Sequence, residues 1–167
     1  MRRIAPICLL AALFVAAPAH AAQTIDVPKL FAKQIRAAKQ RTSVPILLPQ
    51  TFRSEFRRHF PEGEAHAGRW TFDIGAVRDC GAATACFIAE FRAVRGGRPS
   101  GRRTLKLARG RTGFFRPLSC GASCSPPSIE WRERGTLYGI QANVGGRRTE
   151  RRRLVALANS AIRHGPR

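Results

Sequence analysis

The sequence has 167 residues, of which 30 are lysine or arginine and 10 are aspartate or glutamate, so its formal net charge is +20. This length predicts one domain of ordinary size with enough chain for a hydrophobic core, and no internal repeat or low-complexity segment is visible. A surface this basic attracts anionic polymers and lipid headgroups, with a strength that falls steeply with salt. Only four of the basic residues are lysine, so a GC-rich genome explains the arginine bias as well as a binding role does.

The first 21 residues have the three parts of a secretory signal peptide: an arginine pair, an apolar run over 7–17 and the small-residue triplet at 19–21. We predict cleavage after Ala21 and a single exported domain over 22–167, which is periplasmic or secreted. The signal removes two arginines, which leaves 28 basic against 10 acidic residues and a formal charge of +18. No later segment approaches the roughly 20 apolar residues of a membrane helix, so no transmembrane segment is expected in the mature chain.

The mature chain retains four cysteines: Cys80, Cys86, Cys120 and Cys124. An even number in an exported protein predicts two disulfides. Three pairings are open, and loop closure favours long cross-links at about 4 kcal/mol each over local ones at about 2 kcal/mol. We nevertheless favour the local pairs Cys80–Cys86 and Cys120–Cys124, because the first two cysteines flank a turn between two predicted strands.

The N-terminal part of the mature chain predicts one helix and little other regular structure. Asp26 is placed to cap a basic amphipathic helix that runs to about Arg41, with Pro28 in its first turn. We expect this helix to dock on the domain, although such a helix can also lie on a membrane surface. Residues 44–49 then form an extended segment that their prolines confine to a sheet edge or a covering strand. Residues 50–68 are mixed and polar, which indicates a long loop or one short helix.

Alternating apolar and polar residues predict strands at 70–76 and 87–93, and two further strands follow at 104–109 and 114–119. The dipeptide Arg134-Gly135 predicts the tight turn of a hairpin that adds two more strands. This turn places Trp131 opposite Tyr138 and Ile129 opposite Ile140, with the four apolar side chains on one face. The opposite face then carries Glu130, Arg132, Gln141 and Asn143.

The C-terminal segment predicts a helix with its N-cap at Thr149 and its end at Gly165-Pro166, because apolar residues between them recur at helical spacing. The helix is expected to cover one face of the sheet. The sequence therefore predicts an α+β single domain with about six strands in an antiparallel meander sheet, an N-terminal and a C-terminal helix, and two disulfides.

Three segments in the second half of the chain carry a resemblance. The stretches CGASCSPPSIEW at 120–131, GTLY at 135–138 and LANSAIR at 157–163 are similar to a group of small exported bacterial proteins of unknown function. The resemblance covers the last third of the chain well and the remainder loosely. The strand-hairpin-helix ending also resembles, more distantly, domains of exported bacterial proteins and of the extracellular regions of anti-sigma factors. Both resemblances imply export and the fold, and neither implies catalytic residues.

The sequence contains only weak catalytic and metal-binding signatures. The cysteine spacings of four and six differ from the spacing of two in thiol-disulfide enzymes, which favours structural bridges. His59 and His66 bracket two glutamates without the spacing of a helical ligand pair, so no metal is expected. Glu130 could pair with Glu90 or Asp73 as glycosidase carboxylates do, although solvated or salt-bridged acids are commoner. We expect no cofactor, and neither a nucleotide fingerprint nor a motif for specific nucleic acid is present.

Five arginines form the candidate anion-binding site: Arg147, Arg148, Arg151, Arg152 and Arg153. They crowd the predicted start of the last helix, where positive charge is mildly unfavourable and where N–H groups and guanidinium groups bind phosphate or carboxylate. The alternative is that composition alone filled an exposed turn with arginine. We expect a non-catalytic exported domain that meets an anionic envelope polymer, lipid headgroups or an acidic partner protein. The alternative function is an exported hydrolase whose active site is assembled from dispersed carboxylates and histidines.

Overall fold

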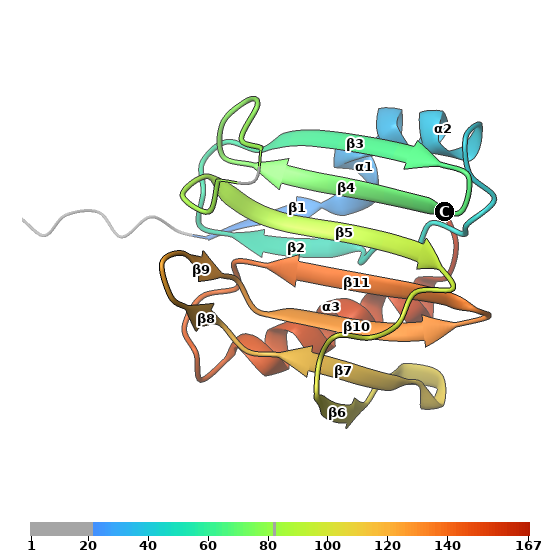
Figure 1. The fold of residues 1–167 in the computed structure, drawn as a ribbon. Helices are drawn as coiled ribbons and strands as arrows, with labels where there is room; N and C mark the ends of the chain where they lie inside the picture. The colour runs from blue at the N-terminus through green and yellow to red at the C-terminus, as the bar shows by residue number, and fades with distance from the viewer. Residues whose placement is uncertain (1–21, 82) are drawn as a thin grey trace, which may run out of the picture.

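A seven-stranded antiparallel sheet forms one of the two layers of the molecule (Figure 1). The computed structural model describes residues 22–81 and 83–167, and the predicted signal peptide at 1–21 lies outside the described residues. The strand order is β3-β4-β5-β11-β10-β7-β6. The strands are β3 (Phe60–His66), β4 (Arg69–Gly75), β5 (Phe87–Arg95), β6 (Arg103–Lys106), β7 (Thr112–Arg116), β10 (Ser128–Glu133) and β11 (Thr136–Ala142).

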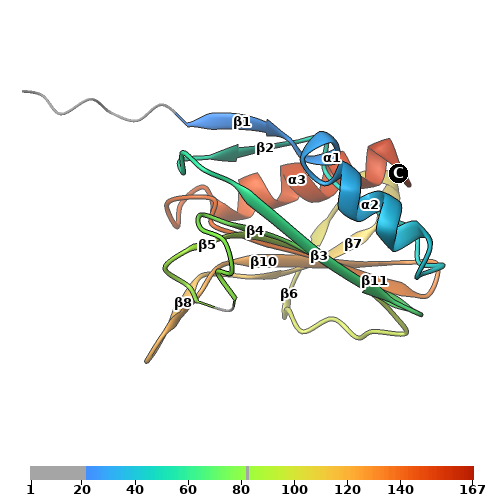
Figure 2. The same cartoon turned by 90° about the horizontal axis from the view of Figure 1, so that it is seen from above.

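Three helices and a small second sheet lie on one side of the central sheet, as Figure 2 shows. The helices are α1 (Val27–Leu30), α2 (Ala32–Lys39) and α3 (Glu150–His164), and the small sheet pairs β1 (Gln23–Asp26) with β2 (Thr51–Ser54). The core fills the space between these layers. Its largest buried side chains include Trp70, Phe72, Phe91, Trp131, Phe31, Phe52 and Leu154. The α+β class is therefore confirmed, and the opposite side of the sheet, which we call the open face, carries no helix within the described residues.

The predicted N-terminal helix is interrupted. Asp26 caps it as expected, since its Oδ1 accepts a hydrogen bond from the Lys29 N–H at 3.0 Å. The helix then breaks at Phe31 (φ −95°, ψ 16°), so that α1 and α2 replace the single element expected to run to Arg41. Phe31 is fully buried, and its ring stacks on Phe72 with centroids 5.2 Å apart. We attribute the break to this packing. It is a tertiary contact, so the helical spacing of residues in the sequence does not reveal it.

The segment at 44–49 forms no strand, and its apolar side chains pack into the core. Val44, Ile46 and Leu48 are buried. The carbonyl of Pro45 accepts two hydrogen bonds at 3.2 Å each, from Trp70 Nε1–H and from the Tyr138 hydroxyl. The segment thus satisfies two polar groups of the core.

The prediction of a loop or short helix at 50–68 is wrong, because this stretch holds β2 and β3. The core-facing positions of β3 are Pro61, Gly63 and Ala65, which pair with core residues of β4. A side chain at Gly63 would meet Phe72 at 2.7 Å and Gln34 of α2 at 3.0 Å. Since α2 packs so closely on this edge strand, small residues occupy the positions where the alternating pattern would need large apolar ones.

The sheet has seven strands where about six were expected, and it is not a simple meander. The strand β5 pairs with β11, along 89–95 and Thr136–Ala142. The loop at 96–102 carries the chain across the open face to the far edge of the sheet (Figure 1). It passes so closely that a side chain at Gly97 would meet Leu137 of β11 and one at Gly101 would meet the Phe114 backbone of β7, each at 2.8 Å.

The two strands predicted at the far edge are shorter than expected. The first ends at Lys106 as β6, and a short 3-10 turn, Ala108–Gly110, replaces its second half. The second begins earlier, as β7, and ends at Arg116. The stretch after it forms a further small hairpin between β8 (Ser119–Cys120) and β9 (Cys124–Ser125).

The hairpin of β10 and β11 has the predicted register. Trp131 lies opposite Tyr138 and Ile129 opposite Ile140. Arg134 and Gly135 both have positive φ, at 47° and 77°, as a primed turn requires. Trp131 is 1% exposed and stacks on the Tyr138 ring with centroids 5.5 Å apart. The turn and the face assignment are thus confirmed.

The C-terminal helix and the disulfides also match the prediction. The helix α3 begins after Thr149 and ends at Gly165, which has a φ of 72°, although the Thr149 hydroxyl donates to the Gly146 carbonyl and does not cap the helix. The bridges are the local pairs Cys80–Cys86 and Cys120–Cys124. No described helix has the length and apolar character needed to cross a membrane.

Candidate functional site

Three acidic residues lie side by side on the open face of the sheet. Glu62 of β3 is opposite Asp73 of β4, and Asp73 is opposite Glu90 of β5. We call these three the carboxylate row. Core residues alternate with them along each strand, so their side chains point to the open face. Like charges directly opposite one another destabilise a sheet, which indicates a role other than stability.

The carboxylate row contains a group that titrates near neutral pH. Burial raises the pKa of Asp73 to about 7, and the charges of Glu90 and Glu62 add to the shift. Arg92 donates to Glu90 at 3.0 Å, whereas no hydrogen bond or ion pair joins a described basic side chain to Asp73. The row thus combines a carboxyl that can hold a proton at neutral pH with a neighbouring carboxylate paired to arginine.

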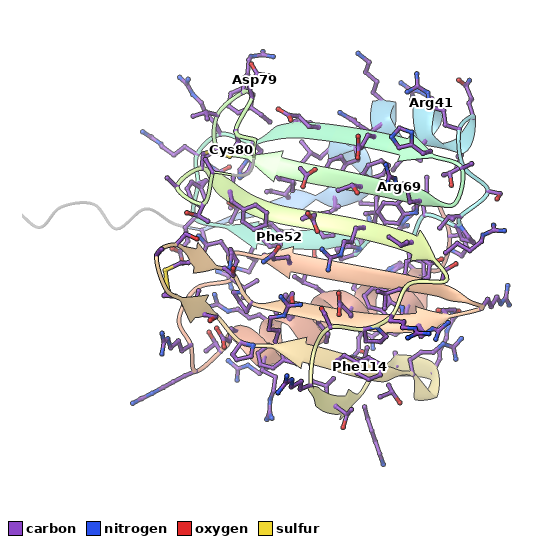
Figure 3. All side chains as sticks on the ribbon, viewed as in Figure 1. Arg41, Phe52, Arg69, Asp79, Cys80 and Phe114 are labelled. Carbon is purple, nitrogen blue, oxygen red and sulfur yellow. A yellow bond between two sulfur atoms is a disulfide. The ribbon has the colours of Figure 1, made fainter. Side chains whose placement is uncertain are left out.

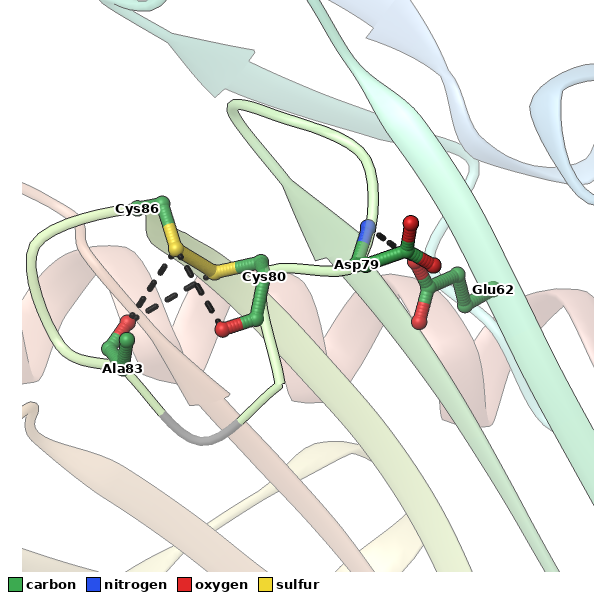
Figure 4. Close-up of a disulfide and its surroundings, with 5 residues drawn as sticks. All are labelled: Glu62, Asp79, Cys80, Ala83 and Cys86. Atoms are coloured by element: carbon green, nitrogen blue, oxygen red, sulfur yellow. Dashed lines mark hydrogen bonds between the residues drawn. A yellow bond between two sulfur atoms is a disulfide. The ribbon is translucent and has the colours of Figure 1, made fainter.

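The carboxylate row lines a hollow of about 490 Å³ on the open face. Phe87 and Gln141 contribute to its walls, and Cys80 and Cys124, one from each disulfide, lie at its border. Figure 3 shows the labelled Cys80 and Asp79 in the loop between β4 and β5. In Figure 4 Asp79, the residue before Cys80 of the bridge, lies beside Glu62, and Glu62 Oε1 accepts a hydrogen bond from the Asp79 N–H at 3.1 Å. Both predicted bridges therefore hold loops next to this hollow.

Glu130 lies on the same face outside this hollow, under the crossing loop. It is 2% exposed, and its carboxylate accepts hydrogen bonds from Arg92 at 2.7 Å and from the Ser100 N–H at 2.7 Å. Burial by itself raises the pKa of Glu130, but the hydrogen bonds from Ser100 and Arg92 outweigh it, and the pKa is lowered. Glu130 therefore stays ionised as a buried structural anion, and of its two predicted carboxylate partners only Glu90 is connected to it, through Arg92.

The histidines take no part in this arrangement. His66 is exposed and its Nε2 lies 3.6 Å from Glu64, while burial lowers the pKa of His59. Neither residue lines the hollow. Among the residues that the structure describes, no group of three or more histidine, cysteine or acidic side chains is placed to hold a metal ion.

The five predicted anion-binding arginines lie at the start of α3, on the helical side of the molecule. All five are exposed, and within 22–81 and 83–167 none of them forms an ion pair. Arg153 differs from the other four, because its guanidinium donates to the Val144 carbonyl. Glu150, the acidic residue among them, is 5% exposed and its Oε2 has no hydrogen-bond partner in the described structure. We call Arg147, Arg148, Arg151 and Arg152 the arginine cluster.

A groove runs beside the arginine cluster, between β2 and α3. It consists of two hollows of about 290 and 350 Å³ that share Arg53, Val144 and Arg153. Towards the far end of α3, the Gln50 N–H donates to Ser160 Oγ at 3.0 Å and ties the start of β2 to the helix. The groove was not predicted, because it depends on a strand, β2, that has weak local signals in the sequence and lies about a hundred residues before α3.

Comparisons with protein-family models, with curated proteins and with solved structures found no match. The resemblance of the segments at 120–131, 135–138 and 157–163 to small exported bacterial proteins therefore stays a prediction.

Proposed function

We propose that this protein is a non-catalytic exported domain that binds an anionic component of the cell envelope through the arginine cluster. The observation that carries the proposal is the exposure of four arginines at one helix start with no acidic partner among the described residues. Export is supported by the signal pattern at 1–21 and by two disulfides, which persist in oxidising compartments.

The distribution of acidic residues adds to this support. The carboxylate row, Glu64 and Glu130 hold five of the ten acidic residues on the open face, whereas α3 lies on the other side of the sheet (Figure 2). Salt screens charges over roughly 8–10 Å, so acids on the far side of two packed layers neutralise the arginine cluster only weakly. The helix start therefore presents positive charge together with the N–H groups of the first turn, which favour phosphate and carboxylate.

The test compares two sets of four arginines. The first variant changes Arg147, Arg148, Arg151 and Arg152 to serine, and the control changes Arg98, Arg102, Arg132 and Arg134, which are exposed on the crossing loop and the β10–β11 hairpin. Each arginine near an anionic surface contributes about 1 kcal/mol, so the first variant should bind anionic liposomes at least about tenfold more weakly than the control. The first variant should also be retained on heparin less strongly than the control. Equal losses from both sets would show that total charge alone matters.

The thermal stability of the two variants separates binding from folding. Basic residues at a helix start are unfavourable by some tenths of a kcal/mol each, so the first variant should keep or slightly raise the melting temperature. A marked fall would mean that the arginine cluster stabilises the fold and would remove the reason for assigning it to binding.

The carboxylate row favours a second candidate function, hydrolysis of an envelope polysaccharide. Asp73 and Glu90 lie directly opposite on neighbouring strands, a position that brings their Cβ atoms to about 4.5–5.5 Å of each other and allows their carboxyl groups a similar separation. Retaining glycosidases hold their two carboxyl groups at about 5–5.5 Å, one as the acid and one as the nucleophile. With a pKa of about 7, Asp73 would serve as the acid and Glu90 as the nucleophile.

Activity on peptidoglycan and on other envelope glycans tests this second candidate. If it holds, Asp73→Asn and Glu90→Gln each abolish release of reducing ends, and the native rate falls above about pH 7, where Asp73 loses its proton. Asp79→Asn, an exposed acid near the hollow, serves as the control. Activity that survives Asp73→Asn would exclude the carboxylate row as its source.

A further inference from the structure

The groove between β2 and α3 combines an apolar lining with two arginines. Phe52, Val144 and Leu157 supply the apolar surface of the hollow nearer the middle of α3, and Arg53 and Arg153 line the same hollow. That hollow contains no carboxylate among its lining residues, while Glu55 lines the neighbouring one. The hollow of about 290 Å³ therefore presents two positive charges beside an apolar surface.

We propose that this groove holds one acyl chain of an anionic lipid, with the headgroup phosphate against Arg53 and Arg153. The proposal rests on the proposed function and names its ligand class. Binding sites for small molecules have volumes of about 300–1,000 Å³, so hollows of about 290 and 350 Å³ suit a single chain and are small for a folded partner.

The position of Arg153 suits this role. Its guanidinium donates to the Val144 carbonyl, which holds the side chain beside the groove before any ligand binds. A guanidinium group has five N–H donors, so one hydrogen bond to the backbone leaves donors for a phosphate. Because the side chain is already ordered, less conformational entropy is lost when the headgroup binds.

The neighbouring arginine cluster supplies the longer-range part of the attraction. Arg152 directly precedes Arg153 in the first turns of α3, and Arg148 and Arg147 lie just before the helix. These residues would draw the protein to an anionic membrane, whereas the groove would hold one lipid molecule. The two steps make different demands on the ligand: the first needs only charge, and the second also needs an acyl chain.

A tryptophan can fill the groove without removing a charge. Ala156 lines the groove and is exposed on α3, so Ala156→Trp places a large side chain there at little risk to the core. The matched control is Ala37→Trp, at an exposed alanine of α2. Both variants and the native exported protein are titrated with a single-chain anionic phospholipid below its micelle concentration, and with glycerol phosphate as the free headgroup.

We expect saturable binding of the single-chain lipid by the native protein and by Ala37→Trp, and at least about tenfold weaker binding by Ala156→Trp. Removing two methylenes from the chain should weaken binding about tenfold, and glycerol phosphate should bind far more weakly than any lipid. Equal binding by Ala156→Trp and Ala37→Trp, or no dependence on chain length, would overturn the groove assignment. So would displacement of the lipid probe by an acidic peptide alone, since within the described residues β2 pairs along one edge only and a peptide strand could add to the other.

The heparin measurement distinguishes a failure of the lipid proposal from a failure of the proposed function. Ala156→Trp leaves the arginine cluster intact, so its retention on heparin should equal that of the native protein. If lipid binding fails while the arginine cluster still governs heparin retention, only the acyl-chain proposal is wrong. If lipid binding fails and heparin retention does not depend on the arginine cluster, both proposals are wrong.

Discussion

Among single residues, Arg92 and Gly139 show how the open face of the sheet is organised. Arg92 lies on β5 and Glu130 on β10, with β11 between them. The Arg92 side chain reaches Glu130 across Gly139, where a Cβ atom would come within 2.9 Å of Arg92 Nε. The absence of a side chain on Gly139 therefore allows the ion pair that neutralises a buried carboxylate.

This contact predicts the effect of a small substitution. In Gly139→Ala the new methyl group displaces the Arg92 side chain and weakens its pairing with Glu130, which should lower the free energy of unfolding by about 1–3 kcal/mol. Urea denaturation measures the change. The control is Gly146→Ala, where a Cβ atom would meet nothing within 4 Å. A Gly139→Ala variant as stable as this control would mean that Arg92 reaches Glu130 by another route.

Asp73 predicts a stability that depends on pH. Its folded pKa of about 7 lies above the ordinary value of 3.8, so the folded state binds the proton more tightly than the unfolded state does. Ionisation of Asp73 should therefore lower the free energy of unfolding progressively as the pH rises from about 4 to about 7.

The Asp73→Asn variant removes this loss of stability. Its free energy of unfolding should equal that of the native protein near pH 3 and exceed it by about 1–2 kcal/mol at about pH 8. The difference is modest because Asp73 is partly exposed and solvent screens the effect. Thermal melts across the pH range measure the difference. Asp79→Asn, in the exposed loop, should show no such trend, and a pH-independent gain at Asp73 would contradict the raised pKa.

At the scale of elements, the β10–β11 hairpin is the central unit of the core. Its strands lie between β7 and β5, and α3 packs on them. Trp131 is buried between these layers and stacks on Tyr138. An element in this position contributes most of its stability through packing, because its strands have neighbours on both edges.

Truncation of Trp131 tests the role of the hairpin. Trp131→Ala removes a buried aromatic ring and should lower the free energy of unfolding by about 3–5 kcal/mol, measured by urea denaturation. Trp131→Phe should lower it much less, since Trp131 Nε1 has no hydrogen-bond partner in the described structure. Arg132→Ala, on the next and exposed position, should be nearly neutral. A small loss in Trp131→Ala would mean that the hairpin is peripheral to the core.

At the scale of the whole molecule, the acidic hollow and the arginine cluster lie on opposite sides of the central sheet. Acidic side chains gather on the open face of the sheet, and the arginine cluster lies on the helical side. Figure 3 shows long basic side chains projecting around the rim. A chain with 30 basic and 10 acidic residues therefore presents an acidic hollow on one side of the sheet and the arginine cluster on the other.

The sequence by itself determined the local features of this fold. The Arg134-Gly135 turn specified the register of its hairpin, because side chains of adjacent strands alternate with a period of two. Asp26 predicted a helix start and Gly165 a helix end, because capping depends on residues within one turn. The local disulfides were predicted because Cys80 and Cys86 flank a turn between two predicted strands.

Only the tertiary structure decided the features that join distant segments. The strand β3 was not predicted, because its core-facing residues are small where α2 packs on them. The pairing of β5 with β11 brings together segments more than forty residues apart, and no local pattern records such a choice. The carboxylate row depends on the unpredicted strand β3 and on its register with β4 and β5. The β2–α3 groove depends on contact between segments about a hundred residues apart. The residues of both sites are ordinary in the sequence, and they form sites only because strand register and packing place them side by side.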